Sequence, residues 1–158
     1  MTSKRSYQGQ FEKCSSKKAR RSIISEIQQA YYNCDIEEVK NLLNETLESE
    51  VEELNECGIL FNAVQDGNDL IVDQLLRLGV NANIPSYKGE SCLQRASENG
   101  DLNIVNMLLK HGARINYKDR SCQTALHKAI QNKHESVVDL LLSNGANVNS
   151  FWLLPSPR

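Results

Sequence analysis

Apolar residues recur along the chain in a pattern that repeats every 33 residues. The stretches that superpose at this step are 68–83, 101–116 and 134–149. The middle stretch carries apolar pairs at 104–105 and 108–109, a spacing that places all four side chains on one helical face. Gly112 follows, and a glycine there ends a helix because it accepts a positive φ. Each stretch therefore predicts an amphipathic helix with a glycine stop.

A shorter helical phrase precedes each long one and repeats at the same step. It reads CGILFNAV, ESCLQRAS and QTALHKAI, with a leucine followed three residues later by an alanine, as in Leu93 and Ala96. We expect a short helix over about 91–98 and over its equivalents. A single repeat of this size cannot bury its apolar face, whereas stacked repeats cover one another. The pattern thus predicts an all-α helical solenoid of about four stacked repeats.

The repeat divides the chain into three segments. We expect a disordered basic tail over 1–22, a repeat array over 23–149 and an irregular apolar tail over 150–158. The predicted copies are a degenerate capping copy at 23–56 and clear copies at 57–83, 89–116 and 122–149.

These features resemble those of the ankyrin repeat, whose period is 33 residues and whose first helix opens with T-P-L-H-x-A. The match is carried by residues 91–96 and 124–129, by the Ile/Val-Val-x-x-Leu-Leu runs, and by Gly-Ala-x-x-Asn at 112–116 and 145–149. The resemblance covers about residues 24–149. It implies a non-catalytic protein that binds other proteins through one concave face.

The resemblance also implies which positions meet a partner, namely the tips of the finger turns and the outward side of the short helices. These positions hold Leu54, Asn55, Gln65, Asp66, Tyr87, Lys88, Glu90, Glu98, Asn99, Arg120, Ser121, Gln123, Gln131 and Asn132. Tyr87 and Arg120 are the expected anchors, because aromatic and guanidinium groups dominate interface energies. The mixed polarity of the set does not identify the partner.

Two glycine positions of the repeat hold other residues in the last copy. Cys122 stands where Gly89 stands one copy earlier, and Lys133 stands where Gly100 does. A non-glycine residue at positive φ costs about 1–2 kcal/mol. We therefore expect local strain or a shifted turn in this copy.

Charge is unevenly distributed, although the 158 residues carry a net charge of only −2. Residues 1–21 hold seven basic residues against one acid, and residues 35–56 hold nine acids against one lysine. Asp35, Glu37 and Glu38 open a helix, where the macrodipole favours negative charge. These acids form either a solvated cap or a patch for a basic partner.

The basic residues of the tail fall into two clusters that resemble a bipartite nuclear-import signal. Its residues would be Lys4, Arg5, Lys17, Lys18, Arg20 and Arg21. A merely solvated tail and weak contact with a phosphate backbone are the alternatives. An import receptor would place the protein in both nucleus and cytoplasm.

No catalytic or metal site is evident. The five cysteines form no Cys-x-x-Cys pair, and they and the three histidines lie in different copies, whereas zinc needs about four converging ligands. The resemblance gives His127 a structural role beside Thr124, and we expect His134 to cap the helix that it opens. We predict no cofactor, no enzymatic activity, no membrane span and an intracellular protein with reduced thiols.

The end of the array leaves two interpretations open. After Asn149 the chain reads SFWLLPSPR, which does not fit the repeat. Either this apolar tail covers the last copy, or the chain is a truncated product of a longer array, with the face of Val137 and Leu141 uncovered. The lack of a polar capping helix favours truncation.

The predicted function is a non-catalytic adaptor or inhibitor that binds a protein through the concave face. A truncated targeting fragment of a larger enzyme or ubiquitin-ligase complex is the alternative. A nucleic-acid-associated protein that uses the basic tail is a weaker one.

Overall fold

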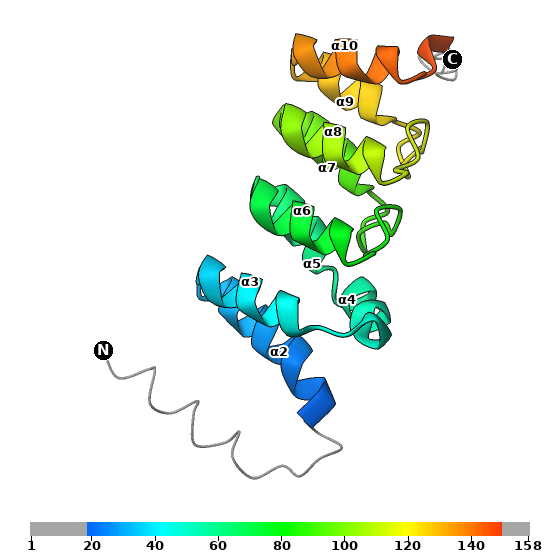
Figure 1. The fold of residues 1–158 in the computed structure, drawn as a ribbon. Helices are drawn as coiled ribbons and strands as arrows, with labels where there is room; N and C mark the ends of the chain where they lie inside the picture. Colours follow the sequence, from blue (N-terminus) through cyan, green and yellow to red (C-terminus); the bar gives the residue numbers. More distant parts are fainter. Residues whose placement is uncertain (1–18, 150–158) are drawn as a thin grey trace. The chain divides into compact units, whose positions relative to one another are not determined.

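The computed structural model describes residues 19–149, and every regular element in that range is helical (Figure 1). The chain divides into two compact units between Thr46 and Leu47. The first unit holds α2 (Ala19–Tyr32) and α3 (Ile36–Glu45). The second unit holds η1 (Glu48–Glu50), α4 (Val51–Cys57), α5 (Ile59–Gln65), α6 (Asp69–Arg77), α7 (Cys92–Asn99), α8 (Leu102–Lys110), α9 (Ala125–Gln131) and α10 (Glu135–Ser143). The all-α solenoid predicted from the repeat is confirmed.

Three helix pairs form successive layers in the second unit (Figure 1). The short helices α5, α7 and α9 contact one another in order, and so do the long helices α6, α8 and α10. Leu93 and Leu126, which are one period apart, are 1% and 2% exposed in adjoining layers. Burying a leucine side chain contributes about 1.5–3 kcal/mol. The apolar core is therefore shared between layers rather than enclosed within any one of them.

Local signals set the limits of these helices. Ser91 and Gln94 form a capping box at the start of α7, because the Ser91 hydroxyl accepts the Gln94 N–H at 3.2 Å and Gln94 Oε1 accepts the Ser91 N–H at 2.8 Å. The helix ends at Gly100, which has a φ of +81°. His134 from the next layer lies against this glycine, and a Cβ there would come within 2.6 Å of the His134 ring. Gly100 is thus required both by its φ and by the close approach of the next repeat.

The clearest departure from the predicted repeat lies at residues 47–57, where η1 and α4 replace the expected finger turn. Leu54, which we expected at an exposed finger tip, is instead completely buried on α4. Glu56 occupies the position that Gly89 and Cys122 fill at positive φ in the later copies. The chain here remains helical and turns two residues later, at Gly58, with a φ of +68°. Glu56, which adopts a positive φ less readily than glycine does, therefore lies in a helix and not in a turn.

The described part of the first unit, residues 19–46, is a pair of helices whose start differs from the sequence prediction. We expected the basic tail to extend to residue 22, but α2 begins at Ala19 and so includes Arg20 and Arg21. Lys4, Arg5, Lys17 and Lys18 lie outside the described residues, as does the apolar tail at 150–158.

α3 begins as the acidic pattern predicted. The Asp35 carboxylate accepts the Glu38 N–H at 3.2 Å, and Glu37 and Glu38 occupy the first turn, where the helix dipole favours negative charge. At its other end the Thr46 hydroxyl donates to the Leu42 carbonyl at 2.9 Å. Threonine therefore ends this helix with its side chain, at the place where the later copies use glycine.

Cys122 and Lys133 adopt a positive φ, at +58° and +61°, so of the two outcomes expected from the glycine alignment the last copy shows strain rather than a shifted turn. The prediction missed a third case, Cys34, whose φ is +59°. Cys34 lies one period before Gly67 and so occupies the same position between two helices. The left-handed turn is retained in the first and last helix pairs although glycine is not, so the turn is imposed by the packing of the helices.

Val137 and Leu141 are buried, at 1% and 0% exposure. The helix that carries them, α10, packs against α8 and α9. The uncovered face that we expected for a truncated array is therefore not found at these two residues.

Replacing Lys133 with glycine should raise the melting temperature. Glycine adopts the φ of +61° without the steric cost of about 1–2 kcal/mol, partly offset by the greater freedom of glycine in the unfolded chain. The net gain should appear as a rise of about 1–4 °C in thermal unfolding followed by circular dichroism. Gly100→Ala is the matched control in the same position and should lower the midpoint. An unchanged or lower midpoint for Lys133→Gly would contradict strain at this residue.

Candidate functional site

Asparagine side chains join successive repeats of the second unit. Asn83 donates through Nδ2 to the Gly112 carbonyl at 3.0 Å, and its Oδ1 accepts the Arg114 N–H at 2.8 Å. Asn116 accepts the Asn147 N–H in the same way, at 2.7 Å. The asparagine of Gly-Ala-x-x-Asn therefore fixes the spacing between one repeat and the next.

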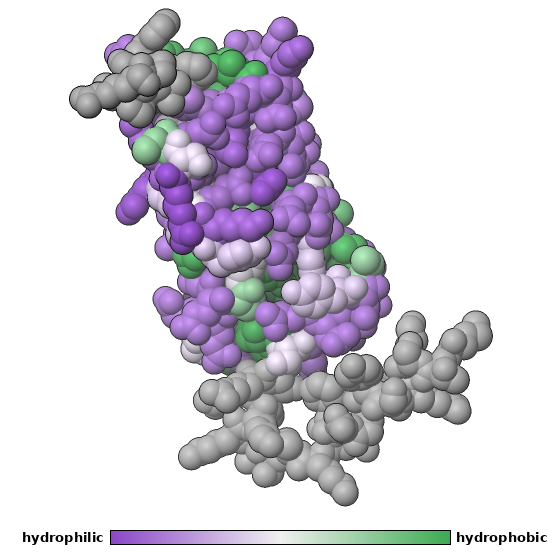
Figure 2. Space-filling view, turned by 180° about the vertical axis from the view of Figure 1, so that it is seen from behind, coloured by the Kyte–Doolittle hydropathy of each residue, from purple (hydrophilic) through white to green (hydrophobic). Residues whose placement is uncertain are grey.

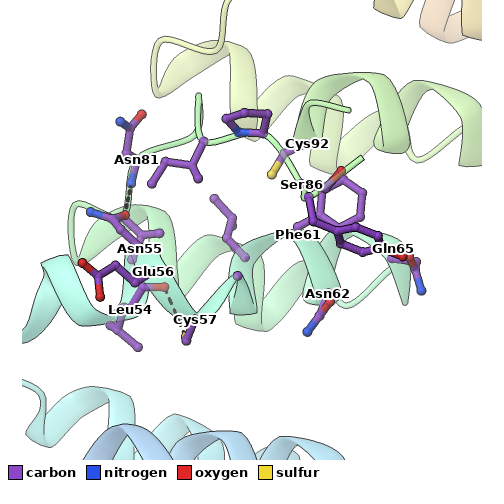
Figure 3. Close-up of a pocket in the computed structure, with 16 residues that line it drawn as sticks. Leu54, Asn55, Glu56, Cys57, Phe61, Asn62, Gln65, Asn81, Ser86 and Cys92 are labelled. Atoms are coloured by element: carbon purple, nitrogen blue, oxygen red, sulfur yellow. Dashed lines mark hydrogen bonds between the residues drawn. The ribbon is translucent and has the colours of Figure 1, made fainter. Parts of the chain in front are cut away.

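Asn55 makes the equivalent contact between repeats from α4, the helix that replaces the finger turn. Its Oδ1 accepts the Asn81 N–H at 2.8 Å, and Asn81 lies one period before Arg114. Residue 50, which a strict period would assign to this contact, is a glutamate. We predicted Asn55 as a contact for a partner, but in this structure its side-chain oxygen holds α4 to the chain that follows α6 (Figure 3).

Two finger turns stand side by side further along the unit, the first finger (84–90) and the second finger (117–123). Tyr117 donates its hydroxyl to the Gly89 carbonyl at 3.1 Å, and Arg120 donates to the Tyr87 carbonyl at 3.3 Å. The Arg120 side chain also lies over Gly89, because a Cβ on that glycine would be 3.2 Å from Arg120 Cγ. Arg120 thus braces the first finger, while the Tyr87 side chain above it is 85% exposed.

Four charged residues form a network across the short helices and the first finger, which we call the charged cluster: Glu90, Arg95, Glu98 and Lys128. Arg95 pairs with Glu90 at 2.7 Å and with Glu98 at 3.5 Å, and Lys128 reaches Glu98 at 3.5 Å. The Arg95 guanidinium also lies 5.8 Å from the centre of the Phe61 ring, a cation–π distance. The cluster ties α5, α7, α9 and the first finger together.

Glu90 is buried within the charged cluster, with 8% of its surface exposed. Burial raises the pKa of its carboxyl, and the charges of Arg95 and Lys128 oppose that rise. The prediction that Glu90 is free to meet a partner is therefore wrong. Its position in the turn is exposed in the sequence pattern, but its side chain folds back onto Arg95.

The other predicted contact positions differ in accessibility. Asn99 is exposed, yet its Nδ2 donates to the Val64 and Gln65 carbonyls of the preceding layer at 3.2 and 3.3 Å. Glu98 and Gln123 are half-buried, and Gln123 supplies the carbonyl to which Gln94 donates at 2.6 Å. The predicted residues with exposed side chains are Gln65, Asp66, Tyr87, Lys88, Asn99, Arg120, Ser121, Gln131 and Asn132.

A cleft of about 310 Å³ opens between α4, α5 and the first finger (Figure 3). Its apolar lining includes Leu60, Phe61, Val80, Ile84 and Pro85. Its polar lining includes Asn55, Glu56, Asn62, Gln65 and Ser86. The sequence did not predict this cleft, because it depends on a helix where the repeat pattern predicts a finger.

Two cysteines also line the cleft, but neither is poised to react. Cys57 donates its thiol to the Leu54 carbonyl at 3.2 Å, and burial raises its pKa. Burial raises the pKa of Cys92 to about 12. Both thiols are therefore protonated near neutral pH, whereas a nucleophilic cysteine needs the thiolate. The two thiols thus do not make the cleft a nucleophilic site.

Thr124 and His127 hold the start of α9 as the family resemblance implied. His127 Nδ1 accepts the Thr124 N–H at 3.1 Å and lies 2.8 Å from the Thr124 hydroxyl. Burial lowers the pKa of His127, the charge of Lys118 lowers it further, and Asp119 opposes them. This histidine is a buried part of a capping box, equivalent to Gln94 one repeat earlier.

His134 does not cap α10 with its side chain, although it occupies the N-cap position. Its ring reaches back to the preceding layer, where Nε2 lies 2.9 Å from the Glu98 carbonyl. The predicted capping role is therefore wrong. The space above Gly100, which has no side chain, admits the ring.

Within residues 19–149 no group of three or more His, Cys, Asp or Glu side chains is arranged to hold a metal ion. Over the same range no helix has the length and apolar character needed to cross a bilayer.

Comparison with known families identifies the architecture. A family model described as ankyrin repeats, in three copies, matches residues 27–119 and 60–151. The matched ranges cover most of the chain, which therefore belongs to the ankyrin-repeat family, as the sequence motifs indicated. Ankyrin repeats are protein–protein interaction modules, so the chain is a module of this kind. No curated protein matches it.

The His127→Gln variant should lose less stability than the parent as the pH falls. The folded pKa of His127 lies below its ordinary value of 6.5, so the unfolded chain binds the proton more tightly. The stability that depends on the neutral ring is present above about pH 6.5 and is lost as the pH falls through the folded pKa. Glutamine does not titrate, and Gln94 already forms the same capping box in α7.

Melting temperatures measured between about pH 7.5 and pH 5 for both proteins give the comparison. The parent should lose more stability over this interval than His127→Gln. Parallel curves would contradict a buried, neutral His127.

Proposed function

We propose that this ankyrin-repeat protein is a non-catalytic adaptor or inhibitor that binds one protein partner through its finger face. The finger face is the side of the second unit formed by the first and second fingers and the outward positions of α5, α7 and α9. Seen from behind, the second unit presents mainly hydrophilic side chains (Figure 2). The Tyr87 side chain, exposed on a braced finger, is the observation that carries the proposal.

The first finger presents Tyr87 on a backbone that is fixed from several directions. The Ser86 N–H donates to the Glu90 carbonyl at 2.8 Å, and the Gly89 N–H donates to the Ser86 carbonyl at 2.8 Å. Arg120 holds the Tyr87 carbonyl from the second finger. A large aromatic side chain on a rigid support loses little conformational entropy on binding, which favours affinity. The Lys88 ammonium lies 5.5 Å from the centre of the Tyr87 ring and leaves the side chain exposed, and an exposed tyrosine is typical of an interface anchor.

The charged cluster supports the same surface in a different way. Glu98 Oε2 lies 3.5 Å from Arg95 Nη1 and 3.5 Å from Lys128 Nζ. Both distances are long for an ion pair, so the carboxylate can accept a shorter hydrogen bond from a partner. A partner could add a hydrogen bond to this half-exposed network without stripping water from an isolated charge, and so at small desolvation cost. We assign specificity to the cluster and affinity to Tyr87.

The proposal includes nuclear as well as cytoplasmic localisation, through an import receptor that binds the two basic clusters of the tail. Extended chains fit the acidic grooves of such receptors, whereas Arg20 and Arg21 lie in the first turn of α2. Four N–H groups at a helix start have no partner within the helix, so the first turn opens at low cost. We infer that this turn unwinds on receptor binding.

Tyr87→Ala combined with Arg120→Ala should weaken binding of the partner about 30-fold or more. Loss of the Tyr87 anchor costs about 2 kcal/mol or more, and about 1.4 kcal/mol is a factor of ten in affinity. Removing the Arg120 side chain also removes its hydrogen bond to the Tyr87 carbonyl, which holds the first finger. The measurement is quantitative pull-down with the full chain as bait, followed by titration of the captured protein. Leu70→Ala with Lys110→Ala, at exposed positions of α6 and α8, is the matched control. Unchanged capture by the Tyr87 and Arg120 variant would reject the finger face.

Lys17→Ala with Lys18→Ala should shift a fluorescent fusion of the full chain from nucleus to cytoplasm. These lysines lie in the second basic cluster, and the import groove recognises their charge. Lys110→Ala with Lys118→Ala removes the same charge from the repeat array and should leave the distribution unchanged. Equal nuclear fluorescence in all three proteins would rule out import through the tail.

A further inference from the structure

We infer that the cleft between α4, α5 and the first finger binds a basic peptide segment that inserts one apolar side chain. The inference rests on the proposed function, because it specifies the chemistry of a protein partner and gives it a second point of attachment. It concerns residues 47–57, where the chain departs from the repeat by forming a helix.

The cleft is built into the structure. Asn55 binds the Asn81 N–H, which holds α4 in position, and Gly58 makes the left-handed turn that directs α5 away from α4. In the following repeats a finger turn occupies the equivalent stretch of sequence. The replacement of a narrow turn by a helix leaves the space that Phe61, Ile84 and Pro85 line.

Size and lining suit a single large apolar side chain. A volume of about 310 Å³ is at the lower end of ligand-binding clefts. Ile84 is half-buried and Pro85 is exposed, so apolar surface at the mouth is within reach of a partner. A side chain that covered this surface would be stabilised by the removal of apolar area from water.

Side-chain amides lie at the edge of the same cleft. Asn62 and Gln65 come from successive turns of α5, and both line the cleft (Figure 3). Each amide offers two donor hydrogens and an acceptor oxygen. They match the alternating N–H and C=O groups of an extended peptide backbone, which suits a segment of chain better than a small molecule.

The charge around the cleft selects a basic partner. Glu52, Glu53 and Glu56 of α4 are exposed, Glu56 lines the cleft, and none of the three forms an ion pair with a described residue. No lysine or arginine occurs between Lys40 and Arg77. Glu52 and Glu56 are four residues apart on one helix, where like charges repel, and a cationic segment would relieve this repulsion. The Arg95 and Lys88 cations lie 5.8 Å from the centre of the Phe61 ring and 5.5 Å from the centre of the Tyr87 ring, so the basic part of the segment is expected at α4 rather than at these rings.

Selection from a phage-displayed library of random dodecapeptides on the full chain tests the inference. We expect the enriched peptides to carry lysine or arginine beside one aromatic or large aliphatic residue. Fluorescence polarisation of the most enriched peptide then gives its Kd, which should rise with added salt because exposed charges are screened.

Glu52→Lys with Glu56→Lys should weaken this peptide at least tenfold. Glu135→Lys with Asp139→Lys is the matched control, because it reverses two exposed acids at the same spacing near the start of α10. Circular dichroism confirms that both variants fold. Ile84→Ala should also weaken binding but keep its dependence on salt, since it removes apolar contact and no charge.

Several outcomes would overturn the inference. These are no enrichment, enrichment of acidic or purely apolar peptides, and equal binding by the two charge-reversal variants. Self-association of the purified chain that Glu52→Lys with Glu56→Lys abolishes would assign the cleft to a second copy instead. Peptides that depend on Arg120, which does not line the cleft, but not on Glu52, Glu56 and Ile84 would leave the finger face standing and exclude the cleft.

Discussion

The structure of the second unit depends on one constraint, that no single repeat can bury its own apolar face. Leucines one period apart, such as Leu93 and Leu126, close the core only when the next layer is present. The asparagines then fix the distance between layers, because the Asn83 amide contacts both Gly112 and Arg114 one repeat later. Hydrophobic contact supplies most of the free energy of folding, whereas these hydrogen bonds set the register in which the layers meet.

Once the register is fixed, local structure between the contacts is free to change. Helix α4 replaces a finger turn, yet Asn55 still meets the Asn81 N–H as Asn83 meets that of Arg114. Cys34, Cys122 and Lys133 likewise keep the left-handed turn of the glycines that they replace. The fold thus conserves interactions at the layer boundary more strictly than residue types. Surface features such as the cleft arise where the chain between those boundaries takes another path.

The same principle separates the surface residues that are available to a partner from those already engaged. Glu90 and Arg120 occupy finger positions like that of Tyr87, but their side chains turn back to Arg95 and to the Tyr87 carbonyl. Long charged side chains fold onto neighbouring polar groups readily, whereas the Tyr87 side chain stays exposed, with Lys88 Nζ 5.5 Å from the centre of its ring. The proposed finger face is therefore smaller than the set of outward positions.

The sequence alone determined the period, the helix pairs, the buried leucines and alanines, and the family, because each follows from spacing along one chain. At Cys122 and Lys133 it left strain and a shifted turn open, and the structure decided for the positive φ. It failed at Leu54, at Asn55, at His134 and at the start of α2. Helix α4 is held through Asn55 by the Asn81 N–H, 26 residues further along the chain. The His134 ring finds its place only because Gly100 lies in the layer before it. Such features were decided by tertiary structure, since their partners lie tens of residues away and no local pattern encodes them.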